Sequence, residues 1–241
     1  METHPPADEP QRLSKLVAAL KHCSRREAEQ YIAEGWVRVD GVCVDEPFFR
    51  VAAHQHVEVD PKARLQRPIR ATFLLHKPAG MRNEEAMALL VADKQWDADA
   101  SGIRFVKTHA AGLQVLLPLP ADASGLAVCS QDDGVVRKLT EDADLVEQEL
   151  VAEVTGTAAA EALAQLGRGI VREGRPPARV SWQSETRLRI AAKAVLSERL
   201  APACEQVGLR LVALKRIRIG RIPMAGLPLG QWRYLPPGER F

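Results

Sequence analysis

The sequence lacks the features of several large classes of protein. It has only four cysteines and no Cys-x-x-Cys pair, so neither a disulfide framework nor a structural metal site is expected. No apolar run approaches the roughly 20 residues of a membrane-spanning helix, and we expect no membrane partner. The glycine patterns of dinucleotide-binding folds and of phosphate-binding loops are absent, so no cofactor is expected either.

What is present is the composition of an ordinary globular protein. Hydrophobic residues make up 46% and charged residues 27% of the 241 positions, which is close to the average for globular domains and suits two of them. Residues 1–10 are polar and contain three prolines, so we expect a disordered tail rather than a signal or transit peptide. The scarcity of cysteine makes the cytoplasm the expected location.

Charge is distributed unevenly, although its sum is small. The net charge is only +2, so the chain as a whole does not indicate a nucleic-acid partner. Basic residues nevertheless form three groups without an intervening acid, at residues 12–26, 62–70 and 210–221, whereas acids concentrate at 84–99 and 132–149. Each basic group is consistent with a solvated surface or with a phosphate-binding one, because a basic run alone is a weak motif.

Residues 11–60 show the pattern of a small domain with two helices and a hairpin. Apolar residues at helical spacing predict a first helix over residues 13–20. Ser24 and Glu27 form a capping box that predicts the start of a second helix, which Gly35 ends. An Asp-Gly pair between two short alternating runs predicts a β-hairpin over residues 37–44, and residues 57–59 predict a last strand.

This pattern resembles the alpha-L RNA-binding domain that occurs in a small-subunit ribosomal protein, in tyrosyl-tRNA synthetase and in many RNA-modifying enzymes. The resemblance implies that RNA contacts come from Arg12, Lys15, Ser24, Arg25 and Arg26. The start of a helix presents free N–H groups to a phosphate, and a cation there opposes the helix dipole unless an anion is bound. The alternative is that the two arginines only keep the helix start soluble. Residues 61–70 are predicted to be a basic linker.

The remaining residues, 71–241, alternate short β-like runs with helical stretches. We predict strands near residues 73–75, 126–129, 151–155, 187–191 and 209–220, a loop at 76–80, and helices over residues 158–166 and 196–207. The mixture predicts an α+β fold with a mixed, mainly antiparallel sheet flanked by helices.

Four segments of this region resemble motifs of the RNA pseudouridine synthases of the RsuA/RluB/RluF type, which also carry an N-terminal alpha-L domain. They are the opening strand and loop at residues 73–80, the Ser-Gly-Leu run at 124–126 with the helix after it, the run at 214–220 and the closing motif at 227–235. The resemblance implies a pseudouridine-synthase-like domain over 71–241. It also suggests Lys77, Lys215, Arg216 and Arg218 as further RNA-binding residues.

The positions that carry the family's chemistry depart from its pattern. These enzymes place their aspartate nucleophile at the end of a Gly-Arg-Leu-Asp run, and here that run reads Leu-Pro-Leu-Pro, with Pro120 in the nucleophile slot. A prolyl ring has neither a nucleophilic lone pair nor a proton to exchange. Leu150 stands where the family's Lys-Glu-Tyr run has its tyrosine. Residues 197–202 stand where the family has an Asn-Arg-Gln-Ile-Arg-Arg run, and Arg199 is one position out of register with an arginine of that run.

Asp122 is the nearby acid that matches a family position, and it is a weak candidate for a substitute nucleophile. In an extended chain it lies two residues, or roughly 6–7 Å, beyond the slot, whereas reacting atoms must be about 3–3.5 Å apart. We therefore predict a protein that binds structured RNA, with ribosomal RNA as the first candidate, and that lacks isomerase activity. Two alternatives stay open: an active uridine isomerase that uses Asp122 or a misaligned acid, and a protein-interaction module in ribosome assembly.

Overall fold

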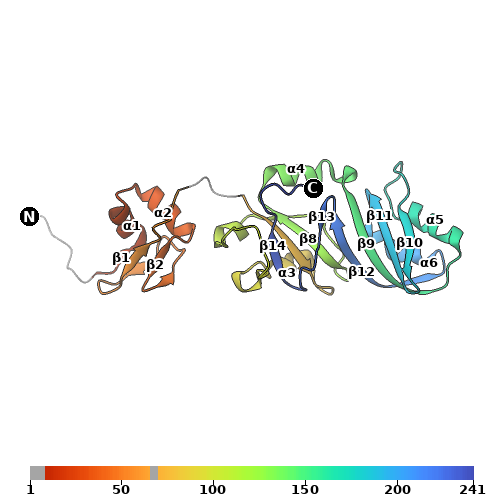
Figure 1. Cartoon of the computed structure of the whole chain (residues 1–241), viewed down its shortest axis with the longest axis horizontal. Helices are drawn as coiled ribbons and strands as arrows, with labels where there is room; N and C mark the ends of the chain where they lie inside the picture. The colour runs from red at the N-terminus through yellow and green to blue at the C-terminus, as the bar shows by residue number, and fades with distance from the viewer. Residues whose placement is uncertain (1–8, 66–69) are drawn as a thin grey trace, which may run out of the picture. The chain divides into compact units, whose positions relative to one another are not determined.

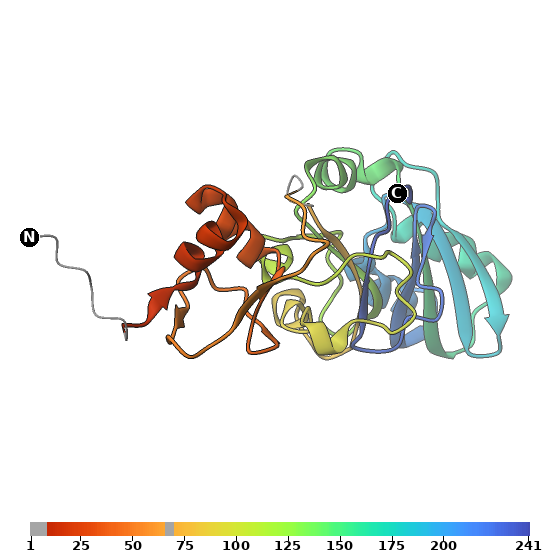
Figure 2. The same ribbon diagram turned by 60° about the vertical axis from the view of Figure 1, so that its left-hand side comes forward.

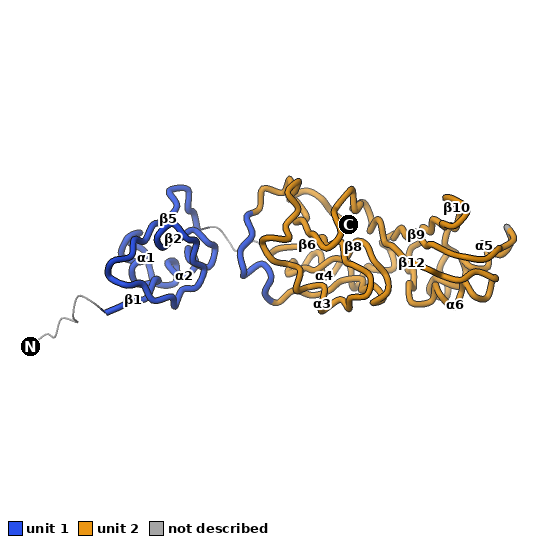
Figure 3. The backbone as a smooth tube through the Cα atoms, turned by 90° about the horizontal axis from the view of Figure 1, so that it is seen from below, with its two compact units in different colours: residues 1–69, 104–111 blue, residues 70–103, 112–241 orange. Residues whose placement is uncertain are grey.

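The computed structural model describes residues 9–65 and 70–241. Most of the predicted tail (residues 1–8) and part of the predicted linker (residues 66–69) lie outside the described residues. The chain divides into two compact units, one of Met1–Ile69 with Arg104–Ala111 and one of Arg70–Ile103 with Gly112–Phe241 (Figure 3). A single cut at residues 61–70 does not give this division, because the short segment Arg104–Ala111 belongs to the first unit. No helix within the described ranges is long and apolar enough to cross a membrane.

The first unit consists of two helices that pack on small β-ladders (Figure 1). Its elements are β1 (Gln11–Arg12), α1 (Leu13–Lys21), α2 (Arg25–Ala33), β2 (Val37–Val39), β3 (Val42–Cys43), β4 (Arg50–Val51), β5 (Val57–Val59) and the 3-10 helix η2 (Lys107–Ala110). Strand β1 pairs with β4, and β2 lies between β3 and β5. The core of the unit is the apolar stripe of each helix against the inward residues of the strands: Leu13, Val17, Ala28, Ile32, Val37, Val39 and Val51.

Local sequence signals account for these elements. The Ser24 side chain accepts a hydrogen bond from the Glu27 N–H, and the Glu27 carboxylate accepts one from the Ser24 N–H, which is the predicted capping box. Helix α2 ends at Gly35, whose φ of 67° is a conformation that glycine adopts without strain. The turn between β2 and β3 has positive φ at both Asp40 and Gly41, as a two-residue hairpin of this hand requires.

The segment Arg104–Ala111 completes the first unit from far along the chain. The Arg104 guanidinium donates a 2.6 Å hydrogen bond to the carbonyl of Glu34 and lies 4.5 Å from the ring centre of Trp36. The Lys107 ammonium is 2.8 Å from a carboxylate oxygen of Asp45. An arginine at the C-terminal end of α2 satisfies a carbonyl that the helix leaves unpaired.

The second unit is built on a nine-stranded sheet in the order β10-β11-β9-β12-β8-β6-β14, with β13 paired to β12 and β7 paired to β8. Only the β12–β8 pair is parallel among the described strands, so the predicted α+β fold with a mixed, mainly antiparallel sheet is confirmed. The strands are β6 (Thr72–Lys77), β7 (Gln114–Leu116), β8 (Ser124–Ser130), β9 (Glu147–Gly156), β10 (Arg179–Ser184), β11 (Arg187–Lys193), β12 (Leu209–Ile219), β13 (Ile222–Pro223) and β14 (Trp232–Tyr234).

Helices flank this sheet and close two cores. They are α3 (Asn83–Met87), α4 (Asp133–Thr140), α5 (Ala160–Gly169) and α6 (Leu200–Glu205), with 3-10 turns η1 (Ala92–Lys94), η3 (Ala143–Leu145) and η4 (Ser197–Arg199). Helices α5 and α6 contact each other and the strands β10 and β12 (Figures 1 and 2). Their apolar residues join those of β9 and β11 in the larger core, whereas α4 contributes to a second core with β6, β7 and β8.

Three expectations about this unit are corrected. His76 and Lys77 belong to strand β6 rather than to the loop after it. Helix α5 continues past Gly167 to Gly169. The absence of a side chain at Gly167 leaves room for the Ala178 carbonyl, which lies 2.4 Å from the place where a Cβ would be. The helix predicted over residues 196–207 is a 3-10 turn followed by the short α6, in which Pro202 lies in the first turn, where a proline is tolerated.

Candidate active site and nucleic-acid interface

The nucleophile slot lies in the loop of residues 117–123, between β7 and β8. Leu117, which stands where the family's run begins with glycine, has a φ of 49°. That left-handed conformation costs a residue with a side chain about 1–2 kcal/mol. The loop thus has a glycine-like backbone at this point without the glycine. Pro120 follows, half-buried, in the slot itself.

The Lys77 side chain donates hydrogen bonds to the backbone of this loop rather than facing solvent, where an RNA phosphate would be. Its side chain is fully buried, and its ammonium donates to the carbonyls of Pro78, Pro120, Ala121 and Ala123 at 3.1, 3.3, 3.1 and 2.8 Å. Burial lowers the pKa of Lys77, and the carboxylates of Asp122 and Glu85 partly offset this. The prediction that Lys77 binds RNA is therefore corrected: its donors are directed at backbone carbonyls.

The loop is also fixed by the segment that follows β6. The Asn83 amide donates to the Leu119 carbonyl at 2.8 Å and accepts from the Leu119 N–H at 3.2 Å. The Gly80 N–H donates to the Ala121 carbonyl at 2.8 Å. These hydrogen bonds engage the backbone groups of residues 119–121, so long-range contacts of the fold set the position of Pro120.

The three altered stations of the family pattern come together in one hydrophobic cluster. Leu119 and Ala123 of the slot loop, Leu150 in the tyrosine slot, and Leu200 of α6 in the arginine run all belong to the larger core. Leu119 and Leu200 stand where the family runs are themselves apolar, so among these residues it is Leu150 that puts an apolar side chain in place of a polar family residue. Asp122, the weak nucleophile candidate, is exposed to solvent.

Glu149 is the buried carboxylate closest in sequence to the tyrosine slot, but it is held by two arginines. One of its oxygens accepts from Arg189, and the other accepts from the Nε of Arg218 at 2.8 Å. These hydrogen bonds, from Arg189 first, lower its pKa. Because consecutive residues of a strand point to opposite faces, Glu149 and Leu150 face opposite sides of the sheet. Glu149 is therefore not a misaligned nucleophile beside Pro120.

Two of the predicted RNA-binding residues of β12, Arg216 and Arg218, form hydrogen bonds with other groups of the protein. Arg216 is buried: its Nε donates to the Leu126 carbonyl at 2.7 Å and its Nη1 to the Gln148 side chain at 3.0 Å. Burial lowers the pKa of Arg216 to about 9, so the guanidinium stays charged at neutral pH. Arg218 pairs with both Glu147 and Glu149. Arg216 is therefore inaccessible to RNA, whereas Arg218 and Lys215 are half-buried and their assignment to RNA binding stays a prediction.

The predicted RNA-binding residues of the first unit are on the surface. Arg12, Lys15, Ser24, Arg25 and Arg26 are all exposed. Arg25 also pairs with Glu29 at 3.1 Å, one turn along α2, which is a weak, solvent-screened interaction. The hydroxyl of Ser24 is used in the capping box, so this residue shapes the helix start and its free N–H groups. The charged residues are available for phosphate.

Comparison with known proteins agrees with this geometry. Residues 11–57 match the S4 domain. The chain is 28% identical over 239 residues to ribosomal large subunit pseudouridine synthase B of Bacillus subtilis, covering 95% of this chain and 93% of that protein. It is 26% identical over 236 residues to the dual-specificity RNA pseudouridine synthase RluF of Salmonella typhi, covering 95% and 76%.

A solved structure titled "Crystal structure of pseudouridylate synthase" superposes with a TM-score of 0.56 at 18% identity, covering 93% of this chain and 95% of that one. This likeness shows a common fold. The chain is related to the RluB- and RluF-type pseudouridine synthases. The sequence resemblance is thereby confirmed, and the first unit contains the S4 domain, the alpha-L domain that its motifs predict.

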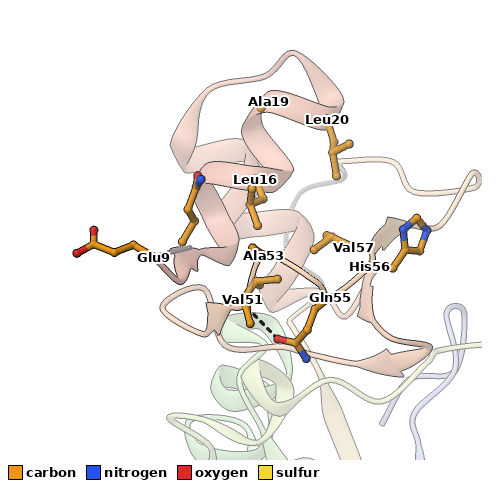
Figure 4. A pocket seen from close by; sticks show the side chains of 11 residues that line it. Glu9, Leu16, Ala19, Leu20, Val51, Ala53, Gln55, His56 and Val57 are labelled. Atoms are coloured by element: carbon orange, nitrogen blue, oxygen red, sulfur yellow. Dashed lines mark hydrogen bonds between the residues drawn. The ribbon is translucent and has the colours of Figure 1, made fainter. Parts of the chain in front are cut away.

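The S4 domain also carries a pocket that no sequence motif indicated. It is lined mainly by apolar residues of α1 and of the segment around β4 and β5, together with Glu9, Gln55 and His56 (Figure 4). The Gln55 amide is already bonded to the Ala52 N–H and to Asp40, and His56 lies 3.1 Å from Glu58. No lysine or arginine lines the pocket, so it lacks the cations that a phosphate would need.

Residues that the sequence reasoning missed include Asn83, which fixes the slot loop, and Arg104, which packs on Trp36. Asn83 follows the His-Lys-Pro-Ala-Gly loop by only three residues, and a polar residue at that spacing is a weak signal at best. Arg104 is 70 residues from its partner Glu34. No local sequence pattern predicts a contact between residues so far apart in the chain.

Proposed function

We propose that this protein binds structured RNA, with ribosomal RNA as the first candidate, on a pseudouridine synthase scaffold that no longer isomerises uridine. The observation that carries the proposal is the slot loop: Pro120 stands at the nucleophile position, and the loop shares a hydrophobic core with Leu150, which stands in place of the family's tyrosine. The scaffold is kept while the acid, the phenol and the cation of the family pattern are replaced. A cytoplasmic location and a ribosome-assembly protein partner stay predictions.

The chemistry explains why the replacement matters. Isomerisation breaks the bond between the uracil ring nitrogen and the sugar and remakes it through a ring carbon, which requires a carboxylate beside the sugar. Pro120 supplies no oxygen or proton at that place. Asp122 is not in an extended segment, as the sequence suggested, but in the turn that the Ala123 N–H closes onto the Pro120 carbonyl at 3.1 Å, where it is exposed to solvent.

Support for RNA binding comes from the S4 domain. Its exposed basic residues lie at the N-terminal ends of α1 and α2. Free N–H groups add to their positive charge at the start of α2, whereas the first N–H groups of α1 are bonded to the carbonyls of Phe49 and Pro47. Contacts of this kind position a protein on RNA without reading its sequence. The relatives named above act, by their names, on RNA and in one case on the large ribosomal subunit.

Filter binding to purified ribosomal RNA tests the binding claim. In the double variant Arg25→Ala, Arg26→Ala, affinity falls and the slope of log K against log salt flattens by about 0.7–0.9 for each lost phosphate contact. The matched control is the double variant Arg137→Ala, Lys138→Ala, which removes two consecutive basic residues from α4. Equal affinity and equal slope for the wild type and the Arg25, Arg26 variant would overturn the binding claim.

Tritium release from RNA labelled at C5 of uracil tests the loss of catalysis, because pseudouridine formation displaces that hydrogen. We expect no release above the background without protein. Release by the wild type that Asp122→Asn abolishes would establish the alternative of an active isomerase. Release that survives Asp122→Asn would instead point to another acid, and either result would overturn the proposal.

A further inference from the structure

One aromatic ring of the S4 domain is exposed beside its basic residues. Phe48 is 66% exposed, and the guanidinium carbon of Arg12 lies 5.5 Å from its ring centre. A large apolar side chain on a surface costs solvation free energy that burial would recover. The pairing with an arginine leaves much of the ring free, so a flat, open surface remains beside a cation.

The backbone holds this ring in place. Phe48 lies in a turn that a 3.0 Å hydrogen bond from the Phe49 N–H to the Glu46 carbonyl closes. The first N–H groups of α1 bind the same turn: Leu13 donates to the Phe49 carbonyl at 2.8 Å and Ser14 to the Pro47 carbonyl at 3.3 Å. The turn thus takes the place of a capping side chain, and the ring is presented on a rigid support.

The surroundings of the ring are positively charged. Arg50 is the cross-strand partner of Arg12 in the β1–β4 ladder, and Lys15 is in the first turn of α1. Two acids precede the turn, Asp45 and Glu46, and both are near the Lys107 ammonium, at 2.8 and 3.8 Å. The single charge of Lys107 balances one of these two carboxylates, so the three cations Arg12, Arg50 and Lys15 outnumber the one remaining acid charge.

We propose that Phe48 is a stacking platform for an unpaired base of the bound RNA, with Arg12 and Arg50 at the phosphates on either side of that base. This inference rests on the proposed RNA-binding function and adds its substrate class: a helix interrupted by a bulged or looped nucleotide. Aromatic and guanidinium planes are the groups that proteins use to stack unpaired bases. A single ring among cations offers too little apolar area for a protein partner, whose contact would need a larger patch.

The test uses two synthetic RNA hairpins that differ in one nucleotide. The first carries a single unpaired 2-aminopurine in its stem, and the second is fully paired. We expect the wild type to bind the bulged hairpin more tightly and to quench the 2-aminopurine fluorescence, because stacking quenches it. Phe48→Ala should weaken binding of the bulged hairpin by about 5- to 100-fold, with no change in the salt slope.

Matched variants separate stacking from other effects. Phe48→Trp should retain affinity and quenching. Leu20→Ala, which removes another exposed apolar side chain of the same domain, should change neither. Equal weakening of both hairpins by Phe48→Ala, or unaltered quenching, would overturn the stacking inference.

The outcome of the test is distinguishable from failure of the proposed function. If the wild type binds neither hairpin and no ribosomal RNA, the RNA-binding proposal fails together with the platform. Only the platform is rejected if the wild type and Phe48→Ala each bind the two hairpins with equal affinity, while the double variant Arg25→Ala, Arg26→Ala still has a reduced salt slope.

Discussion

The ammonium of Lys77 donates a hydrogen bond to the carbonyl of Pro120 at 3.3 Å. A buried lysine of β6 thus holds the backbone of the residue predicted to occupy the nucleophile slot. Three further carbonyls accept from the same ammonium. These hydrogen bonds fix the backbone of the slot loop on both sides of Pro120.

Lys77→Met should therefore destabilise the protein rather than weaken RNA binding directly. The variant leaves buried carbonyls without a donor, and we expect the free energy of unfolding to fall by about 1–3 kcal/mol. Urea unfolding measures the loss, with Lys94→Met, an exposed lysine, as a control within about 0.5 kcal/mol of wild type. A Lys77→Met protein of wild-type stability with a reduced salt slope would instead place Lys77 at a phosphate.

Gly125→Ala should be among the most damaging single substitutions in the second unit. A Cβ at Gly125 would lie 2.2 Å from the carbonyl oxygen and 2.5 Å from the nitrogen of Arg216, because β8 and β12 run side by side here. The neighbouring atoms are backbone and cannot turn away. We expect a loss of about 3 kcal/mol or more, or no folded protein.

The control for Gly125→Ala is Gly226→Ala. Gly226 also has a positive φ, of 80°, but nothing lies within 4 Å of a Cβ there. Its loss should be limited to the left-handed backbone cost of about 1–2 kcal/mol. Equal losses from the two variants would show that β8 and β12 are not in close contact at Gly125.

Ser24→Ala should loosen the start of α2. The substitution removes the acceptor of the Glu27 N–H, and the loss of such a cap costs about 0.5–2 kcal/mol. Faster amide hydrogen exchange in the first turn of α2 measures it. Ser24→Asp keeps an acceptor and should keep the protection, while its negative charge weakens RNA binding. Unchanged exchange in Ser24→Ala would mean that the capping box does not stabilise the helix.

Local patterns predicted the parts of the fold that local interactions build. The Ser24–Glu27 box, Gly35 and the turn at residues 40–41 each specify their conformation within a few residues. What the sequence could not predict is set by long-range contacts. Three carbonyls from distant residues accept hydrogen bonds from Lys77, and Arg216 is buried against strands β8 and β9. In a sequence both look like surface cations.

The ion pairs of Glu149 should make stability depend on pH. Hydrogen bonds from Arg189 and then Arg218 lower the pKa of Glu149 in the folded protein, so the unfolded state binds more protons as the medium becomes acid. The stabilisation is present above the ordinary glutamate pKa of about 4.3 and is lost as the pH falls through the lower, folded value. The free energy of unfolding should thus decrease below about pH 5.

Glu149→Gln isolates this contribution. It should reduce stability at pH 7 by about 1–3 kcal/mol, because the two arginines lose a charged acceptor, and it should flatten the acid limb of the stability curve. Glu153→Gln is the matched control, since Glu153 is on the same strand, half-exposed, and 3.9 Å from Arg187. An acid limb that Glu149→Gln leaves as steep as in the wild type would contradict the assignment.

Pro120→Asp should not restore isomerisation, because a carboxylate in the slot meets only part of the family pattern. Leu150 still stands in place of the tyrosine, and Ala201 in place of an arginine of the helical run. Tritium release from C5-labelled ribosomal RNA should stay at the background for Pro120→Asp, as for the control Pro118→Asp, which adds the same charge two residues earlier. Turnover by Pro120→Asp alone would show that only the nucleophile is missing, and that the apolar contacts of Leu150 and Leu200 in the core leave room for the reaction. Turnover that appears only when Leu150→Tyr is added would locate the second missing group in the tyrosine slot.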